Sequence, residues 1–185
     1  FAEYMHHIES GGWEGVAELM LGSVRKLAEA GADFAVCPDN TIHQAFDIVE
    51  KESPIPWIHI ADAVGEEARD RGFQKLGISG TRFLMEGPVY PSRLRPRGIM
   101  WDIPDEQARI RLNDIIFDEL VYGVFTGEAR EYFYSVYSGF LERGCDAAVM
   151  GCTEIPLLVV PEESPLPVLD STRLLARAAL RKASV

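Results

Sequence analysis

The sequence predicts a parallel α/β fold, because short apolar segments typical of strands alternate with amphipathic segments typical of helices along the whole chain. The 185 residues are enough for one large or two small α/β domains with a buried core. The alternation of strand and helix begins again near Gly72, so we place the most probable domain boundary there.

The first part of the chain begins with a helix over residues 13–30, where apolar side chains recur at helical spacing and Gly31 provides a natural stop. Residues 1–8 are interpreted as the lead-in to that helix. The elements expected next are a strand at 33–37, a helix at 40–51, a strand at 57–60 and a helix at 61–71.

The second part continues the alternation. Pro88 and Pro91 should break or bend a helix expected at 83–94, because proline cannot donate its main-chain hydrogen bond. The other expected elements are strands at 74–79, 99–101, 147–150 and 166–169, and helices around 112–120, at 128–143, from 154 and at 171–182.

Composition excludes several classes of partner. A formal net charge of -11 argues against a nucleic-acid or anionic-membrane surface, since both would repel the chain. No apolar run approaches the ~20 residues of a membrane span. The three cysteines form neither a paired framework nor a C-x-x-C pattern, which favours a cytoplasmic location, and the histidines show no metal-ligand spacing.

Two stretches have the same organisation, residues 33–43 and residues 147–156. Each is an apolar strand that ends in polar residues at the expected start of a helix. The first ends in Asp39–Asn40–Thr41, and the second ends in Gly151–Cys152–Thr153–Glu154. Because helix starts present unpaired N–H groups, we expect a cleft whose two walls both carry reactive groups and hydrogen-bond donors.

These motifs, Gly-Ala-Asp with Pro-x-Asn-Thr-x-His at 31–43 and Gly-Cys-Thr-Glu at 151–154, resemble the aspartate/glutamate racemase superfamily. Further matches are Gly80–Thr81, Tyr90 and Asp170-x-Thr172, in the family's order over nearly the whole chain. The resemblance implies two pseudo-symmetric α/β domains, 1–71 with 160–185 and 72–159, and an active site in the cleft between them. It also implies a site without a cofactor, a homodimer, and a first strand and glycine-rich loop that would precede Phe1.

The resemblance also implies roles for individual residues. Cys152 and Asp39 would be the catalytic pair, one on each face of the substrate carbon. The other predicted site residues fall into two groups. Asn40, Thr41, Thr81 and Thr153 would bind the substrate, and His43 and Glu154 would contact the catalytic pair without touching the substrate. Removing a proton beside a carboxylate needs such preorganised donors, and a thiol near a helix start is expected to have a lowered pKa.

The sequence departs from the family pattern at two positions. Asp39 stands where family members carry their first cysteine, and Leu84 stands where relatives commonly carry a hydroxyl residue that could bind a carboxylate. An ordinary aspartate, with a pKa of ~3.9, is a weak base at neutral pH and is not protonated to act as an acid. Burial would raise the pKa of Asp39, and donors at a helix start would lower it.

We therefore expect a racemase-like or epimerase-like isomerase that removes the alpha proton of a small carboxylic acid, for example an amino acid such as aspartate or glutamate. Two alternatives stay open. One is a lyase or decarboxylase in which Cys152 alone moves the proton, and the other is an inactive relative that only binds its ligand. A thiol of ordinary reactivity at Cys152 would favour the second.

Overall fold

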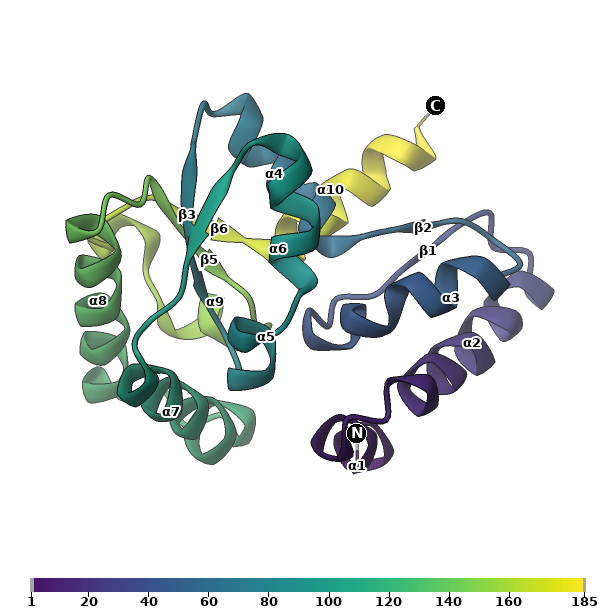
Figure 1. The fold of residues 1–185 in the computed structure, drawn as a ribbon, viewed down its shortest axis with the longest axis horizontal. Helices are drawn as coiled ribbons and strands as arrows, with labels where there is room; N and C mark the ends of the chain where they lie inside the picture. Colours follow the sequence, from purple (N-terminus) through teal and green to yellow (C-terminus); the bar gives the residue numbers. More distant parts are fainter. Residues whose placement is uncertain (1, 185) are drawn as a thin grey trace.

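The computed structural model describes residues 2–184 and confirms the parallel α/β fold (Figure 1). The described strands form a two-stranded sheet of order β1-β2 and a four-stranded sheet of order β4-β3-β5-β6, and all pairings are parallel. The strands are β1 (Ala35–Val36), β2 (Trp57–Ile58), β3 (Lys75–Ser79), β4 (Met100–Asp102), β5 (Ala147–Met150) and β6 (Val168–Asp170).

Helices connect the strands, as parallel pairing requires. The α-helices are α1 (Ala2–Ser10), α2 (Trp13–Glu29), α3 (Phe46–Glu52), α4 (Ile60–Asp70), α5 (Arg82–Glu86), α6 (Val89–Leu94), α7 (Glu106–Asp114), α8 (Gly127–Glu142), α9 (Ile155–Leu158) and α10 (Ser171–Ala183). Shorter helical turns are η1 (Thr41–Ala45), η2 (Arg95–Arg97), the π-helical η3 (Ile115–Glu119), η4 (Leu120–Tyr122) and η5 (Pro161–Glu163).

The four-stranded sheet is covered on both faces, so β5 is buried throughout and β3 is buried from Leu76 onward. Alternation along β5 directs Ala147 and Val149 into a core shared with α4, α6 and α10, and directs Ala148 and Met150 into a second core shared with α7, α8 and α9. A third core lies between α2, α3 and β1, beside the larger sheet (Figure 1).

Three expected helices differ from the structure in form. The helix expected at 83–94 is split into α5 and α6 at Gly87–Pro88, because the extended Gly87 ends α5. The helix expected at 40–51 begins as the 3₁₀ turn η1, and the stripe around 112–120 includes a π-helical segment, η3. Residue 1 lies outside the described residues, and the segment from Ala2 onward forms α1.

The C-terminal segment takes part in both groups of elements. Strand β6 pairs with β5 in the larger sheet, although it lies within the stretch 160–185 that the expected division joins to the first domain. Helix α10 packs against α4 and reaches β2 (Figure 1). The division into domains at residues 72 and 160 stays a prediction.

Candidate active site

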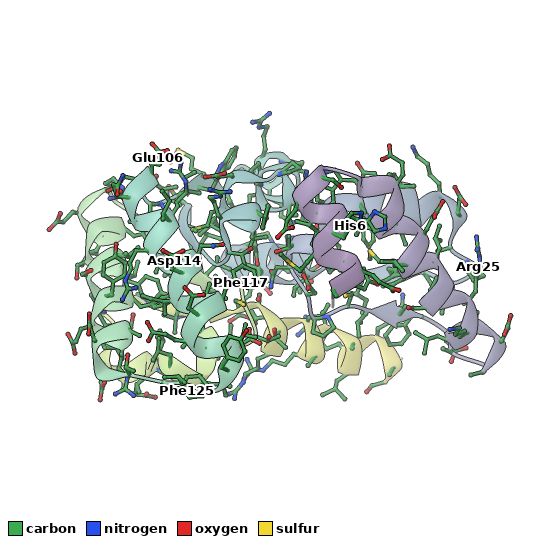
Figure 2. All side chains as sticks on the ribbon, turned by 90° about the horizontal axis from the view of Figure 1, so that it is seen from below. His6, Arg25, Glu106, Asp114, Phe117 and Phe125 are labelled. Carbon is green, nitrogen blue, oxygen red and sulfur yellow. The ribbon has the colours of Figure 1, made fainter. Side chains whose placement is uncertain are left out.

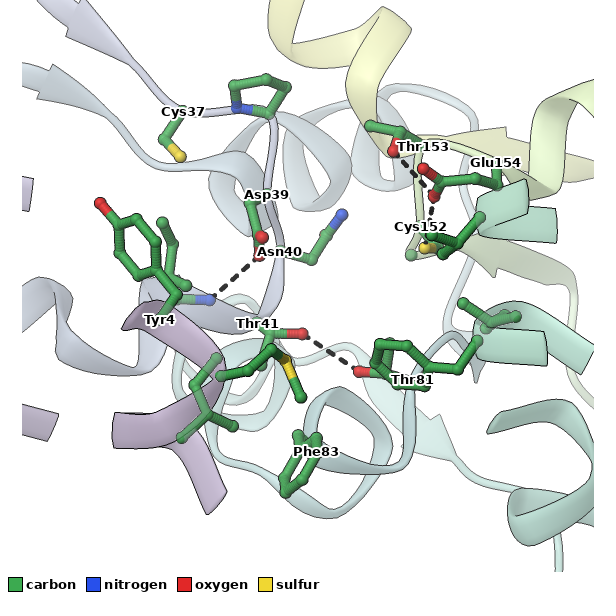
Figure 3. A pocket seen from close by; sticks show the side chains of 18 residues that line it. Tyr4, Cys37, Asp39, Asn40, Thr41, Thr81, Phe83, Cys152, Thr153 and Glu154 are labelled. Carbon is green, nitrogen blue, oxygen red and sulfur yellow. Dashed lines mark hydrogen bonds between the residues drawn. The ribbon is translucent and has the colours of Figure 1, made fainter. Parts of the chain in front are cut away.

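A cavity of about 470 Å³ lies where the two groups of elements meet. One wall is the segment 37–42 after β1 together with α1, and the other is formed by the residues that follow β3 and β5. Side chains from both walls reach into it (Figure 3). The predicted site residues that line this cavity are Asp39, Asn40, Thr41, Thr81, Cys152, Thr153 and Glu154.

Asp39 lies on the first wall, at the start of the turn η1. Its Oδ1 accepts a hydrogen bond of 3.2 Å from the main-chain N–H of Ile42, so the carboxylate also caps the turn. Asp39 is exposed to the open cavity, while protein surrounds the carboxyl group on its other sides. The resulting desolvation raises the pKa of Asp39, although the N–H groups of Ile42 and Thr41 act in the opposite direction.

The charge of Glu154 on the second wall also contributes to this increase in the pKa of Asp39. The two carboxyl groups therefore interact across the cavity. Of the two opposed effects expected from the sequence, burial is the larger, and Asp39 is a stronger base than an aspartate in water.

Cys152 lies on the second wall, directly after β5 and Gly151. Its S–H donates a hydrogen bond of 2.9 Å to Oε2 of Glu154, and the hydroxyl of Thr153 donates to the same oxygen at 2.8 Å. Figure 3 shows Cys152, Thr153 and Glu154 as a single cluster separated from Asp39 by the cavity. One carboxylate oxygen thus orients both the thiol and the neighbouring hydroxyl.

The expectation that a helix start lowers the pKa of Cys152 is wrong. Burial raises that pKa, and the hydrogen bond to Glu154 and the negative charge of Glu154 raise it further. The main-chain N–H of Glu154 acts in the opposite direction but is outweighed. Helix α9 has only four residues, so it offers little dipole to stabilise a thiolate. Cys152 is therefore a protonated thiol, suited to donate a proton.

Thr41 and Thr81 join the two walls directly. Their hydroxyl oxygens lie 3.1 Å apart, and both residues are buried. Thr81 also caps α5, because its Oγ1 accepts a hydrogen bond from the N–H of Leu84 at 3.3 Å. The pair fixes the spacing between the walls at the floor of the cavity.

Asn40 is held at both ends of its side-chain amide. Its Oδ1 accepts from the hydroxyl of Tyr90 at 2.7 Å, and its Nδ2 donates to Oγ of Ser171 at 3.0 Å. Ser171 in turn donates to the main-chain oxygen of Met150 at 2.8 Å, at the end of β5. This buried chain of hydrogen bonds connects the Asp39 segment to the end of β5, two residues before Cys152.

His43 does not line the cavity. Its Nε2 accepts from the N–H of Ile60 at 3.3 Å, so Nδ1 carries the proton and donates to the main-chain oxygen of Asp39 at 2.7 Å. Burial lowers the pKa of His43 to about 4, which keeps the ring neutral. His43 therefore holds the backbone of Asp39 rather than its carboxylate.

Gly151 and Gly80 let the ends of β5 and β3 approach closely. A methyl group at Gly151 would lie 2.7 Å from the carbonyl oxygen of Ser79 and would also strike Leu84. Leu84 is buried and packs under both glycines instead of facing the cavity. The side chain of Leu84 therefore packs in the core and does not line the cavity.

Sequence reasoning gave Tyr90, Ser171 and Tyr4 no role in the site, and it favoured a packed core cysteine at Cys37 over a substitute thiol. Tyr90 was recognised only as a motif match, and Ser171 was overlooked between the two polar residues of the Asp170-x-Thr172 motif. Tyr4 and Cys37 line the cavity beside Asp39, and burial is the main cause that raises the pKa of each. No periodic signal marked Tyr4, because it reaches the cavity only through the packing of α1 against α2.

Within residues 2–184, no group of three or more His, Cys, Asp and Glu side chains could hold a metal ion. No helix in that range is both long enough and apolar enough to cross a membrane.

Fold and cavity together define a parallel α/β protein with a thiol and a carboxylate on opposite walls of a small-molecule site. The family model for Asp/Glu/Hydantoin racemase matches residues 5–179, and the chain belongs to this family. Among curated proteins it is 20% identical over 158 residues to the broad specificity amino-acid racemase of Bacillus subtilis (strain 168). That match covers 84% of this chain and 66% of the Bacillus protein, so the chain spans just under two thirds of the relative's length.

Solved structures agree with this assignment. A Yersinia pestis protein provisionally assigned as an Asp/Glu racemase is 34% identical, with a TM-score of 0.91, over 100% of this chain and 81% of its own. An aspartate racemase homologue from Pyrococcus horikoshii OT3 is 31% identical, with a TM-score of 0.84, over 95% of this chain and 77% of its own. Glutamate racemase from Francisella tularensis shares the fold at 16% identity and a TM-score of 0.67, over 92% of this chain and 64% of its own.

Proposed function

We propose that this chain is a cofactor-independent amino-acid racemase or epimerase that exchanges the alpha proton of a small carboxylic acid. The observation that carries the proposal is the placement of Asp39 and Cys152 on opposite walls of one cavity, each with a raised pKa. Membership in the racemase family and the racemase names of its relatives support the same reaction class.

In the proposed reaction, the carboxylate of Asp39 takes the proton from one face of the alpha carbon, and the Cys152 thiol gives its proton to the other face. The transient negative charge on the substrate carboxylate would be stabilised by donors among Asn40, Thr41 and Thr81. Racemisation in the other direction requires a thiolate at Cys152. In that direction the thiol proton first passes to solvent and Asp39 is protonated, after which the thiolate takes the alpha proton from its face and Asp39 gives its proton to the other face.

Each turn leaves Asp39 protonated and Cys152 deprotonated, or the reverse. Both groups border an open cavity, and proton exchange with solvent restores the starting state. Thr153, whose hydroxyl donates to Glu154, would hold the acceptor oxygen in line with the thiol. His43 would fix the main chain of Asp39. The homodimer and the cytoplasmic location expected from the sequence stay predictions alongside this proposal.

The test is exchange of the alpha proton for deuterium in heavy water, together with chiral chromatography of the product, for glutamate, glutamine and methionine. Cys152→Ala should abolish racemisation. Cys145→Ala removes a thiol that is buried in the core and does not line the cavity, so it serves as the matched control and should retain activity. Undiminished racemisation in Cys152→Ala would reject the assignment.

The same experiment separates the two alternatives. Release of a smaller product would indicate a lyase or decarboxylase. A ligand that protects Cys152 from alkylation without any proton exchange would indicate a binding protein.

A further inference from the structure

We infer that the cavity takes an amino acid with a single carboxylate and an uncharged, largely apolar side chain, rather than a dicarboxylate such as aspartate or glutamate. This inference rests on the proposed function and names its substrate class. The argument comes from the charges, the free donors and the apolar wall of the cavity.

Charge is the first part of the argument. Two carboxyl groups, those of Asp39 and Glu154, line the cavity, and among residues 2–184 no lysine, arginine or histidine lines it. A substrate with two carboxylates would bring two further negative charges to a site without a compensating cation. The alpha-amino group of any amino acid can neutralise part of this field, but a side-chain carboxylate cannot.

Arg82, the arginine adjacent in sequence to the cavity residue Thr81, has its interactions outside the cavity. Arg82 lies beside Thr81, but it lines a neighbouring hollow that shares Met5, Phe83 and Phe117 with the cavity. Its guanidinium group faces Glu86 at 3.9 Å and lies 5.9 Å from the ring centre of Phe83. Arg82 therefore does not line the cavity, and Glu86, the acid that it faces, also binds Arg109 at 2.9 Å.

The supply of side-chain donors also fits one carboxylate. Oγ1 of Thr81 already accepts from Leu84, and one hydroxyl of the Thr41–Thr81 pair donates to the other, so the pair has one O–H left for a ligand. Asn40 gives one of its two amide N–H groups to Ser171, which leaves the other. The Thr153 hydroxyl is committed to Glu154. These residues leave two donors, which match the two oxygens of one carboxylate, and Tyr4, which also lines the cavity, carries a neutral hydroxyl donor that suits an uncharged side chain.

The rest of the lining is apolar and comes from both walls. Helix α1, the turn η1, helix α5 and the segment η3–η4 contribute its side chains. Figure 2 shows Phe117, on η3, at the side of that segment turned toward α1. The apolar lining residues are Met5, Ile8, Ile42, Phe83, Ile116, Phe117 and Val121. An apolar side chain would bury its surface here, whereas a carboxylate would lose hydration without a partner.

Equilibrium dialysis of the wild-type chain against glutamate, glutamine and methionine tests the inference. Dialysis reports total ligand, so interconversion of enantiomers does not disturb it. Glutamine and methionine should bind more tightly than glutamate by about tenfold, because a carboxylate a few ångströms from Asp39 and Glu154 is repelled. The ratio should shrink in high salt, which screens the repulsion. Equal or tighter binding of glutamate, or no binding of any of the three, would overturn the inference.

A charge-insertion pair sharpens the test. Val121 lines the cavity and is 45% exposed, so Val121→Arg can supply the missing cation without burying it. Tyr122→Arg adds an arginine at the next residue, which is 76% exposed and does not line the cavity. Val121→Arg should favour glutamate over glutamine by about tenfold relative to wild type, and Tyr122→Arg should leave the ratio unchanged within about twofold.

Equal effects of the two variants would contradict the inference, and the wild-type comparison decides it if either variant fails to fold. The outcome is independent of the proposed reaction. Proton exchange on glutamate with tight glutamate binding would uphold the function and refute the substrate class. Preference for glutamine and methionine without exchange would uphold the ligand class and refute the reaction.

Discussion

The thiol of Cys152 donates its proton to the carboxylate of Glu154, two residues later in the chain, at a distance of 2.9 Å. Glu154 is a strong hydrogen-bond acceptor for the thiol, and the negative charge of Glu154 raises the pKa of Cys152 beyond the effect of burial. Most reactive cysteines are activated by a neighbouring positive charge. Here the neighbour is an acid, so the resting thiol is a proton donor and its reactivity is low.

Replacing Glu154 by glutamine should therefore make Cys152 more reactive. The substitution removes the negative charge, lowers the pKa of the thiol, and should speed its alkylation at pH 8 by about tenfold for each unit of the fall. Iodoacetamide labelling followed by mass spectrometry measures this rate for each cysteine separately. Cys37, whose pKa is raised to about 11 mainly by burial, is the internal reference. Slower or unchanged labelling of Cys152 would show that Glu154 does not raise the pKa of the thiol.

Gly151→Ala should destabilise the chain by about 1–3 kcal/mol, because the new methyl group would meet the backbone of Ser79 at 2.7 Å. The control is Gly22→Ala in the interior of α2, where a methyl group meets nothing within 4 Å and should stabilise by roughly 0.5–1 kcal/mol. Urea unfolding of the two variants gives the comparison. The same sign of change in both variants would contradict the close approach of β3 and β5.

Ser171→Ala removes one member of the hydrogen-bond chain between Asn40 and the end of β5. The amide of Asn40 and the carbonyl of Met150 lose a partner in a buried place, so unfolding free energy should fall by about 1–3 kcal/mol. Tyr90→Phe, which removes the donor to the other end of Asn40, should behave similarly. Because the two changes act on the same amide, a double-mutant cycle should show coupling of at least about 0.5 kcal/mol. Strict additivity would argue against a connected network.

Stability should fall as the pH decreases below about 6.5, the pKa of a histidine in the unfolded chain. Burial lowers the pKa of His43 to about 4 and that of His59 to about 2, so between these values and about 6.5 the unfolded chain binds more protons. Each histidine contributes a slope approaching ~1.4 kcal/mol per pH unit in this window. Asp39 acts in the opposite direction, because its raised pKa favours proton binding by the folded chain.

The difference in the pH dependence of stability between wild type and His43→Gln isolates the proton that His43 binds on unfolding. Urea unfolding at pH 7, 6 and 5 should show a smaller loss of stability on acidification in the variant, by about one proton's slope. An identical pH dependence would mean that His43 is not buried as a neutral ring.

Much of the fold followed from local pattern. The fully apolar strand before Gly151 and the alternation of strands with helices were sufficient for the parallel α/β class, and most helices lie within a few residues of their expected limits. The membership of β6 in the larger sheet was not predicted, since three residues carry no signal of which neighbour they pair with. The π-helical segment η3 was missed for a related reason, because its apolar stripe is compatible with an ordinary helix.

Only part of the candidate site could be predicted from the sequence. Motif residues after strands were expected to face one cleft, and the residues after β1, β3 and β5 do line one cavity, although β1 belongs to a different sheet from β3 and β5. The pKa shifts of the site residues could not be predicted from the sequence. The direction of the Cys152 pKa shift depends on where Glu154 places its carboxylate, and the roles of Ser171 and Tyr4 depend on contacts between segments far apart in the chain.

The most direct test of the two-walled site is deuterium incorporation at the alpha carbon, measured separately from each enantiomer of whichever of glutamate, glutamine and methionine exchanges fastest. If each enantiomer presents its proton to a different wall, Asp39→Asn should slow exchange from one enantiomer by about 100-fold or more and spare the other. Cys152→Ala should show the opposite selectivity. Loss of the same enantiomer's exchange in both variants, or full exchange of both enantiomers in Asp39→Asn, would contradict the account.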